Sequence, residues 1–264
     1  MLQIRNLHKT FNAGSINEKV VFNDLSLSVN KGQFITIIGS NGAGKSTLLN
    51  VISGLIQSDY GTIQLEGLDI SAMPEYKRSR NIGRVFQDPS AGVAPNMTIL
   101  ENMSMAYNKG KSFNLTWGIS RKNISHFREL LSEVDLGLED KLYNKVGILS
   151  GGQRQALSLI MSVMSKPKLL LLDEHTAALD PKTSETINEI TDKIVSQYDM
   201  TTLMVTHNVN HAIKMGNRLL MMDQGKVILD VQGEQKKNLT VNKLLSHFES
   251  LNSNSGFSDR VLFA

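Results

Sequence analysis

The stretch Gly39-Ser40-Asn41-Gly42-Ala43-Gly44-Lys45-Ser46 has the spacing of a phosphate-binding loop, in which two glycines precede a lysine and a serine. Glycines let the backbone curl until several N–H groups face one anion, and a helix that starts at the loop adds the positive end of its dipole. The lysine would then reach the outer phosphates of a nucleotide, and the serine hydroxyl would ligate magnesium. A chance match is expected in roughly 1% of chains of this length. We therefore predict that this stretch and Thr47 bind ATP together with Mg²⁺.

The segments around the loop carry the periodicity of a strand before it and of a helix after it. Residues 33–38 form a short apolar run, and residues 47–55 carry leucine, valine and isoleucine at helical spacing. Strand, glycine-rich loop and helix, in that order, is the arrangement that the motif requires. The same patterns predict strands at 3–7, 20–29, 169–173, 202–206, 218–223 and 226–231, and helices at 124–134, 153–164, 181–198, 210–215 and 241–251.

The order of these segments predicts an α/β fold built on a P-loop NTPase core. The composition changes after Gln87, where a Met-rich segment and a polar segment lead into predicted helices. We expect the ATP-binding core at 1–87 and 166–232, with its N-terminal strands in an antiparallel β subdomain. An inserted α-helical subdomain would occupy 88–165, and a C-terminal helix with a loose tail would occupy 233–264.

Composition narrows the possible functions. The 264 residues suffice for one large α/β domain, with or without an inserted subdomain. The formal charge of +3 comes from 28 basic and 25 acidic residues scattered along the chain, so we expect no nucleic-acid partner and interpret Lys236-Lys237 as a solvated loop. The lack of cysteine excludes disulfides, a thiolate nucleophile and cysteine metal sites. No apolar run has the length of a membrane span, so partners would have to hold the protein at a membrane.

An acidic pair follows a fully apolar strand. Residues 169–172 are four leucines, which predicts a buried central strand of a parallel sheet. Asp173 and Glu174 stand at its carboxyl end, where open α/β sheets place their ligands. Alone, such a pair could equally be a helix cap or a turn. Beside a phosphate loop, we interpret Asp173 as a ligand in the magnesium shell and Glu174 as the group that orients or deprotonates the attacking water.

A second anion-binding helix start is predicted at Ser150-Gly151-Gly152-Gln153. The serine would cap the helix at 153–164, and the paired glycines would expose its first amides. Alone, a Ser-Gly-Gly stretch is most often a plain junction between a loop and a helix, but a phosphate loop in the same chain favours the functional interpretation. Further along, Asp180 before Pro181 is a good N-cap with proline at the first helical position.

Taken in this order, the motifs resemble those of the ATP-binding subunits of ABC transporters, over roughly residues 2–232. Residues 149–153 resemble the signature sequence of that family. Residues 169–174 resemble its Walker B strand, and residues 177–180, which end at Asp180, resemble its D-loop. The joint pattern is highly specific, and it implies the fold of an ABC ATPase and the hydrolysis of ATP.

Three single residues gain a role only through this resemblance. Gln87 stands at the position of the family's Q-loop, which implies contact with magnesium and the attacking water. His207 stands where the family has its switch histidine, which implies contacts with the γ-phosphate, with Glu174 and with the water. Phe11 matches the aromatic residue that stacks on adenine, although an aromatic side chain beside strands is usually part of the core.

The resemblance also implies partners. Two copies would form a head-to-tail dimer in which each ATP lies between the phosphate loop of one copy and Ser150 to Gln153 of the other; without that second copy, Ser150 and Gly152 would face solvent. The dimer would bind at the cytoplasmic face of the membrane. Its closing and reopening would there drive the conformational changes of separate integral membrane permease subunits. Similarity to stand-alone cassettes of bacterial uptake systems implies import with an extracytoplasmic substrate-binding protein, and residues 173–180 resemble a subgroup with amino-acid-type substrates.

Some features depart from the family, and other functions stay open. His175 stands where many relatives have proline, and residues 158–165 lack the alanine and arginine usual after the signature.

An ABC exporter with separate ATPase chains would show the same motifs. A soluble ABC ATPase of DNA repair or translation would usually carry a long coiled-coil insertion or a second cassette, which this sequence lacks. A small-molecule kinase that shares only the phosphate loop would lack the signature and the switch histidine.

Overall fold

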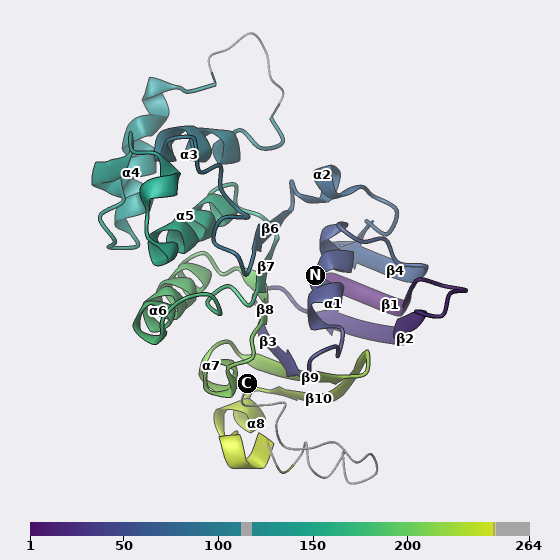
Figure 1. Cartoon of the computed structure of the whole chain (residues 1–264). Helices are drawn as coiled ribbons and strands as arrows, with labels where there is room; N and C mark the ends of the chain where they lie inside the picture. The colour runs from purple at the N-terminus through teal and green to yellow at the C-terminus, as the bar shows by residue number, and fades with distance from the viewer. Residues whose placement is uncertain (112–117, 245, 247–264) are drawn as a thin grey trace. The chain divides into compact units, whose positions relative to one another are not determined.

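The computed structural model describes residues 1–111, 118–244 and 246, and the chain forms two compact units. The first unit comprises Met1–Glu75 with Met200–Ala264, and the second comprises Tyr76–Asp199 (Figure 1). None of the helices in the described ranges combines the length and the apolarity needed to cross a lipid bilayer. The domain limits expected from the sequence, with a helical insertion at 88–165, stay a prediction.

The first unit contains an antiparallel sheet in the order β2-β1-β4-β5. Its strands are β1 (Leu2–Phe11), β2 (Lys19–Val29), β4 (Tyr60–Leu65) and β5 (Leu68–Asp69). Leu2 and Ile4 of β1, and Leu25, Leu27 and Val29 of β2, are buried in alternation with exposed residues, as a period of two predicts. Register shifts between Ile4 and Thr10 interrupt the alternation in β1. The predicted antiparallel β subdomain is therefore confirmed, and it also includes β4 and β5, which the sequence pattern did not reveal.

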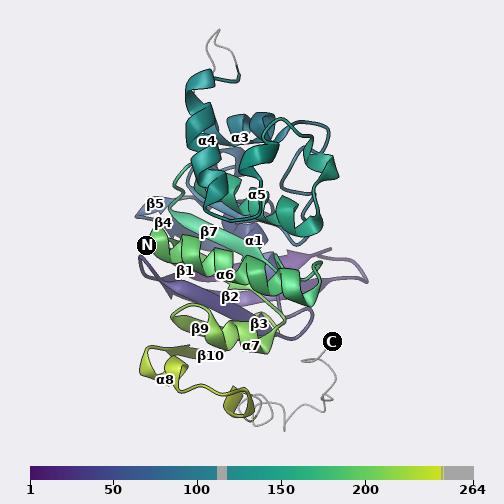
Figure 2. The same cartoon turned by 90° about the vertical axis from the view of Figure 1, so that its left-hand side faces the viewer.

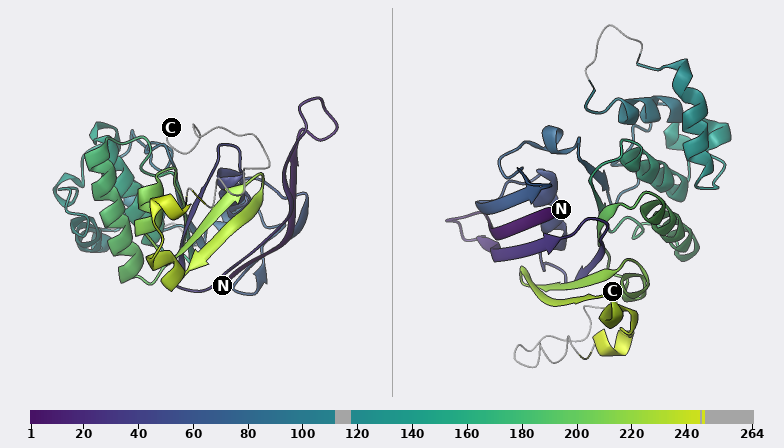
Figure 3. Two further views of the ribbon diagram at one scale, coloured as in Figure 1. Left: turned by 90° about the horizontal axis from the view of Figure 1, so that it is seen from below. Right: turned by 180° about the vertical axis from the view of Figure 1, so that it is seen from behind.

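Within the same unit, the strands of a second sheet follow the order β10-β9-β3-β8. Both β8 and β9 pair in parallel with β3. β10 pairs antiparallel with β9 to form a hairpin, which is yellow-green in Figure 3. All residues of β3 are buried because the strand lies inside the sheet and α1 and α7 pack against it. The bounds are β3 (Phe34–Gly39), α1 (Lys45–Ser53), β8 (Thr201–Val205), α7 (Val209–Lys214), β9 (Arg218–Asp223) and β10 (Lys226–Gln232).

The second unit combines a parallel strand pair with helices. The strands β6 (Ile82–Val85) and β7 (Leu169–Asp173) pair in parallel. Helix α5 packs against β6 and contacts α3, α4 and α6. Figure 2 shows α3 and α4 next to α5. The helices predicted at 124–134, 153–164 and 181–198 are confirmed with small shifts at their ends. The main helices are α3 (Ile99–Tyr107), α4 (Ile124–Ser132), α5 (Gly151–Val163) and α6 (Pro181–Gln197), and the short ones are α2 (Glu75–Arg78), Arg121–Asn123, Glu139–Lys141 and Val146–Ile148.

The chain after β10 differs from the prediction. A short helix, α8 (Glu234–Lys237), follows the hairpin, and its Lys236 side chain is only 4% exposed. The Lys236 ammonium donates hydrogen bonds to the backbone oxygens of Met215 and Gly216, directly after α7. The interpretation of this segment as a solvated loop was therefore wrong for Lys236. Residues 241–244 and 246 are helical, whereas the rest of the helix predicted to reach residue 251, and the tail after it, lie outside the described residues.

Candidate functional site

The phosphate loop lies between β3 and α1, as the sequence predicted. β3 ends at Gly39 and α1 starts at Lys45, with Gly44 as its N-cap at a φ of 98°. A Cβ atom at Gly39 would stand 2.0 Å from the backbone oxygen of Met222, and one at Gly44 would stand 2.7 Å from Cε1 of Phe22. A larger residue at either position would have to displace its neighbour. These two glycines are therefore required by packing as well as by the curl of the loop.

The Lys45 side chain folds back over the loop from the first turn of α1. It is only 5% exposed, and its Nζ donates hydrogen bonds to the backbone oxygens of Gly39 at 2.7 Å and of Ser40 at 2.9 Å. A buried ammonium needs such acceptors because desolvation destabilises an uncompensated charge. Ser46 follows in the same turn and is half-buried. The loop thus holds a cation beside the N-terminus of a helix, a combination that attracts phosphate oxygens.

His207 leaves the sheet at the same edge as the phosphate loop. β8 pairs in parallel with β3, so both strands end on one side of the first unit. The His207 side chain is exposed, and it stands at the turn into α7, which Asn208 caps by accepting from the backbone N–H of His211 at 3.1 Å. The fold of the first unit therefore brings His207 and the loop to a common edge.

Phe11 ends β1 and stays half-buried. The Lys9 ammonium lies over its ring, 5.5 Å from the ring centroid. Asp59 accepts from Nζ of Lys9 at 2.8 Å and from the backbone N–H of Thr10 at 2.6 Å. Burial tends to raise the pKa of Asp59, but the hydrogen bonds from Lys9 and Thr10 and the lysine charge outweigh it and hold that pKa below its ordinary value. A half-buried ring with one ordered cation fits a stacking surface, and the contact of Phe11 with adenine stays a prediction.

The acidic pair stands at the end of β7, and the four leucines before it are fully buried, as predicted. Oδ2 of Asp173 lies 3.1 Å from Nη2 of Arg84 on the neighbouring strand β6. The Arg84 guanidinium also lies 4.7 Å from the centroid of the Phe86 ring. Glu174 has a φ of 48°, in the left-handed region, so the chain turns sharply as it leaves the strand. Nothing in the sequence pattern pointed to Arg84, because it sits within an ordinary short strand.

The chemistry of the predicted ligands suits magnesium. Asp173 offers a carboxylate, Ser46 a hydroxyl and Gln87 an amide oxygen, and Mg²⁺ prefers oxygen ligands, with one or two carboxylates completed by water and substrate phosphates. Within the described part of the chain, no group of three or more His, Asp or Glu side chains could hold a metal by itself. The contacts of magnesium with Asp173, Ser46 and Gln87 stay a prediction.

Gln87 follows β6 by two positions and is exposed. Because β6 and β7 are parallel neighbours, Gln87 and the acidic pair leave the strands on the same side. The residue before it, Phe86, is fixed through its backbone oxygen, which accepts from Nε2 of the buried Gln155 at 3.1 Å. The second unit thus brings Gln87 to the same edge as Asp173 and Glu174.

Ser150 caps α5 in the predicted manner. Its Oγ accepts from the backbone N–H of Gln153 at 3.2 Å, and its own N–H donates to Oε1 of Gln153 at 3.3 Å, which makes a capping box. Ser150 is exposed, whereas Gly152 is buried. A Cβ atom at Gly152 would lie 2.4 Å from Cγ2 of Thr183 in α6. The expectation of solvent exposure was therefore wrong for Gly152, which lets α5 and α6 approach closely, while Gly151 keeps its predicted place at the helix start.

Asp180 caps α6, and His175 packs in the interior of the same unit. The Asp180 carboxylate accepts from the backbone N–H of Thr183 at 3.1 Å, and its hydrogen bonds with Thr183 hold its pKa below the ordinary value. His175 is 2% exposed, and its Nε2 lies 3.0 Å from Oγ1 of Thr191. The buried His175 side chain therefore has a polar partner on α6.

Sequence relatives agree with the motifs. The family model described as ABC transporter matches residues 22–177. A tyrosine transport ATP-binding protein of Clostridioides difficile is 53% identical over 94% of this chain and 99% of that protein. A spermidine/putrescine import ATP-binding protein of Haemophilus influenzae is 34% identical over 87% of this chain and 57% of that protein.

Solved structures agree with the fold. A dimeric ATP-binding cassette in a post-hydrolysis state, bound to ADP and Pi, aligns with a TM-score of 0.75 and 27% identity, over 88% of this chain and 98% of the other. An ATP-binding cassette of an ABC transporter in its ADP conformation aligns with a TM-score of 0.76 and 28% identity, over 94% and 98% of the two chains. With the phosphate loop, the apolar strand before the acidic pair and the capped signature helix in place, the chain belongs to the ABC transporter family, as an ATP-hydrolysing cassette.

Proposed function

We propose that this cassette energises the import of a small amino-acid-type solute, such as an aromatic amino acid, through separate membrane subunits. The observation that carries the proposal is the 53% identity, over 94% of this chain, to a tyrosine transport ATP-binding protein. Relatives at lower identity are named for the import of polyamines and of aliphatic sulfonates. The relatives at lower identity are thus named for import, whereas the amino-acid class rests on the first relative, which is named for transport.

In the proposed reaction, water attacks the γ-phosphate of ATP and leaves ADP and phosphate. Lys45 and the N–H groups of the loop hold the outer phosphates, and Phe11 stacks on the adenine. Glu174 orients or deprotonates the water, and His207 contacts the γ-phosphate and orients Glu174. Magnesium, when bound, would neutralise charge that develops on the phosphates, and the residues that would hold it are Ser46, Asp173 and Gln87.

A second copy of the chain would complete each nucleotide site. The capping box leaves Ser150 exposed at the N-terminus of α5, where the helix dipole favours an anion. Similarity to a dimeric cassette bound to ADP and Pi supports a head-to-tail pair. In such a pair the same two surfaces meet reciprocally, so the phosphate loop of each copy would face Ser150 to Gln153 of the other.

The transported solute would touch other proteins. Integral membrane permease subunits would form the pathway, with the cassette bound at the cytoplasmic face of the membrane. An extracytoplasmic substrate-binding protein would deliver the solute. Closing of the cassette pair on ATP and reopening after hydrolysis would switch the permease between its outward-facing and inward-facing states, because each nucleotide state favours one arrangement of the pair.

Reconstitution of the cassette with the membrane subunits that co-purify with it tests the proposal. We expect liposomes with ATP on the cassette side to accumulate labelled tyrosine or another aromatic amino acid supplied on the opposite side. The matched control is Lys45→Ala in the same preparation, which should abolish accumulation because it removes the phosphate-binding ammonium. ATP-driven movement away from the cassette side would demonstrate export, and uptake of polyamines or sulfonates alone would contradict the amino-acid class.

A further inference from the structure

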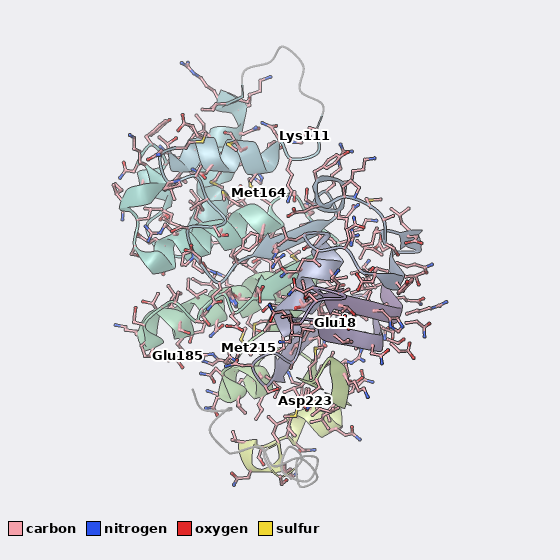
Figure 4. All side chains as sticks on the ribbon, turned by 45° about the vertical axis from the view of Figure 1, so that its right-hand side comes forward. Glu18, Lys111, Met164, Glu185, Met215 and Asp223 are labelled. Atoms are coloured by element: carbon pink, nitrogen blue, oxygen red, sulfur yellow. The ribbon has the colours of Figure 1, made fainter. Side chains whose placement is uncertain are left out.

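A side-chain hydrogen bond joins the phosphate loop to the β9–β10 hairpin. Oγ of Ser40 donates to Oδ1 of Asp223 at 2.8 Å. Asp223 is the last residue of β9 and is half-buried (Figure 4). Asp223 belongs to none of the sequence motifs of the nucleotide site. The contact therefore gives the loop a charged partner, Asp223, which no sequence pattern predicted.

The same hairpin turn holds the loop at a second point. The backbone N–H of Gly225 donates to the backbone oxygen of Ala43 at 3.0 Å, and the N–H of Ala43 donates to the oxygen of Ser40 at 3.1 Å. Gly225 has a φ of 76°, and a Cβ atom there would lie 1.8 Å from the backbone oxygen of Val21. The hairpin turn is thus packed closely against β2. It is hydrogen-bonded to the phosphate loop at both Ser40 and Ala43.

The hydrogen bonds from the hairpin contribute most to the shape of the loop when a nucleotide is present. The Lys45 ammonium donates two hydrogen bonds within the loop, to the backbone oxygens of Gly39 and Ser40. A bound phosphate would compete for the Lys45 ammonium, so these inner bonds would weaken during nucleotide binding. The bond from Ser40 to Asp223 does not use that ammonium, so phosphate would not compete for it.

We propose that Asp223 is a positioning residue of the nucleotide site, which holds the phosphate loop in its anion-binding shape through Ser40. The inference rests on the proposed nucleotide role of the loop. A preformed site binds more tightly than a loose one because less conformational entropy is lost on binding. A hydrogen bond to a carboxylate is also stronger than one between neutral groups. Asp223 itself acts only through the loop.

A purely structural role for Asp223 predicts a different result. In that case its loss would lower the stability of the first unit without changing the nucleotide affinity of the folded protein. Asp230 on β10 provides the matched control, because its carboxylate pairs with Arg218 at 2.6 Å within the same hairpin. Asp230→Asn should lower the melting temperature and leave the nucleotide affinity unchanged.

Titration of the full-length protein with a fluorescent ADP analogue, and with ATP in a phosphate-release assay, tests the inference. We expect Ser40→Ala and Asp223→Ala each to raise the Kd for ADP roughly tenfold. The double variant should show no further increase, because both changes remove the same bond. Asp223→Asn keeps an acceptor for Oγ of Ser40 and should retain most of the affinity. The KM for ATP should rise more than kcat falls.

Three outcomes would overturn the inference: additive effects in the double variant, an unchanged Kd in Asp223→Ala at a lowered melting temperature, or an equal rise in Kd for Asp230→Asn. If Asp223→Ala does not fold, Ser40→Ala decides alone, and an unchanged Kd in that variant overturns the inference. Wild-type protein that binds neither ATP nor ADP would instead refute the proposed function, so the two failures can be told apart.

Discussion

Replacing Arg84 by methionine should make the stability of the protein depend strongly on magnesium. Nη2 of Arg84 lies 3.1 Å from Oδ2 of Asp173, and the two side chains are only 10% and 13% exposed. Removing one partner of a buried ion pair typically costs about 3–5 kcal/mol, because the remaining charge loses part of its compensation. Because both side chains keep some exposure, we expect about 3 kcal/mol, or roughly 6–12 °C in melting temperature for a chain of this size. Methionine keeps an unbranched apolar side chain at this position, so the change is mainly one of charge.

Magnesium with a nucleotide should restore much of this loss, because the cation would take the place of the missing charge beside Asp173. The measurement is the melting temperature with ADP, before and after addition of Mg²⁺. Arg84→Met should gain more from Mg²⁺ than the wild type does. Arg218→Met is the matched control, because Arg218 also pairs with an aspartate, at 2.6 Å, and its loss should leave the magnesium increment unchanged. Equal increments in the wild type and Arg84→Met would refute the reasoning.

Three further results are expected. Phe11→Ala should raise the KM for ATP several-fold in phosphate-release assays, whereas Phe11→Trp keeps a stacking surface and should not. The hydrogen bonds with Thr183 lower the pKa of Asp180, so the Asp180 cap should stabilise the fold above about pH 4 and lose this effect as the pH falls through the lower folded-state pKa. The unfolding free energies of the wild type and Asp180→Ala should therefore converge between about pH 7 and about pH 3. A constant difference would contradict this expectation. Lys236→Met should lower the unfolding free energy by about 1–3 kcal/mol in urea, while the exposed Lys237→Met should not.

The elements that could be predicted from the sequence are those encoded in a few adjacent residues. The loop from Gly39 to Ser46 fixes where β3 ends and α1 begins. Ser150 with Gln153, and Asp180 with Pro181, mark two helix starts that the structure confirms. In each case the residues that set the backbone geometry and those that satisfy its N–H groups lie within one turn of each other.

Contacts between distant positions could not be predicted in this way. Ser40 and Asp223 are 183 positions apart, and no periodicity connects them. Lys236 lies in a stretch with the polar pattern of a surface loop, and it is buried only because backbone oxygens after α7 accept from its ammonium. Gly152 is buried because α6 packs against the first turn of α5, which the signature sequence alone does not reveal. Tertiary packing decides all three.

The molar mass of Glu174→Gln, measured by light scattering with and without ATP and Mg²⁺, decides whether the chain hydrolyses ATP as a pair. Loss of the carboxylate should stop phosphate release and leave ATP bound, so we expect the mass of two chains with ATP and of one chain without it. Adding Ser150→Asp should prevent pairing, because aspartate still caps α5 but places a negative charge where the partner's γ-phosphate would lie. A Glu174→Gln protein that remains a single chain at saturating ATP, or that releases phosphate at the wild-type rate, would contradict the proposed mechanism.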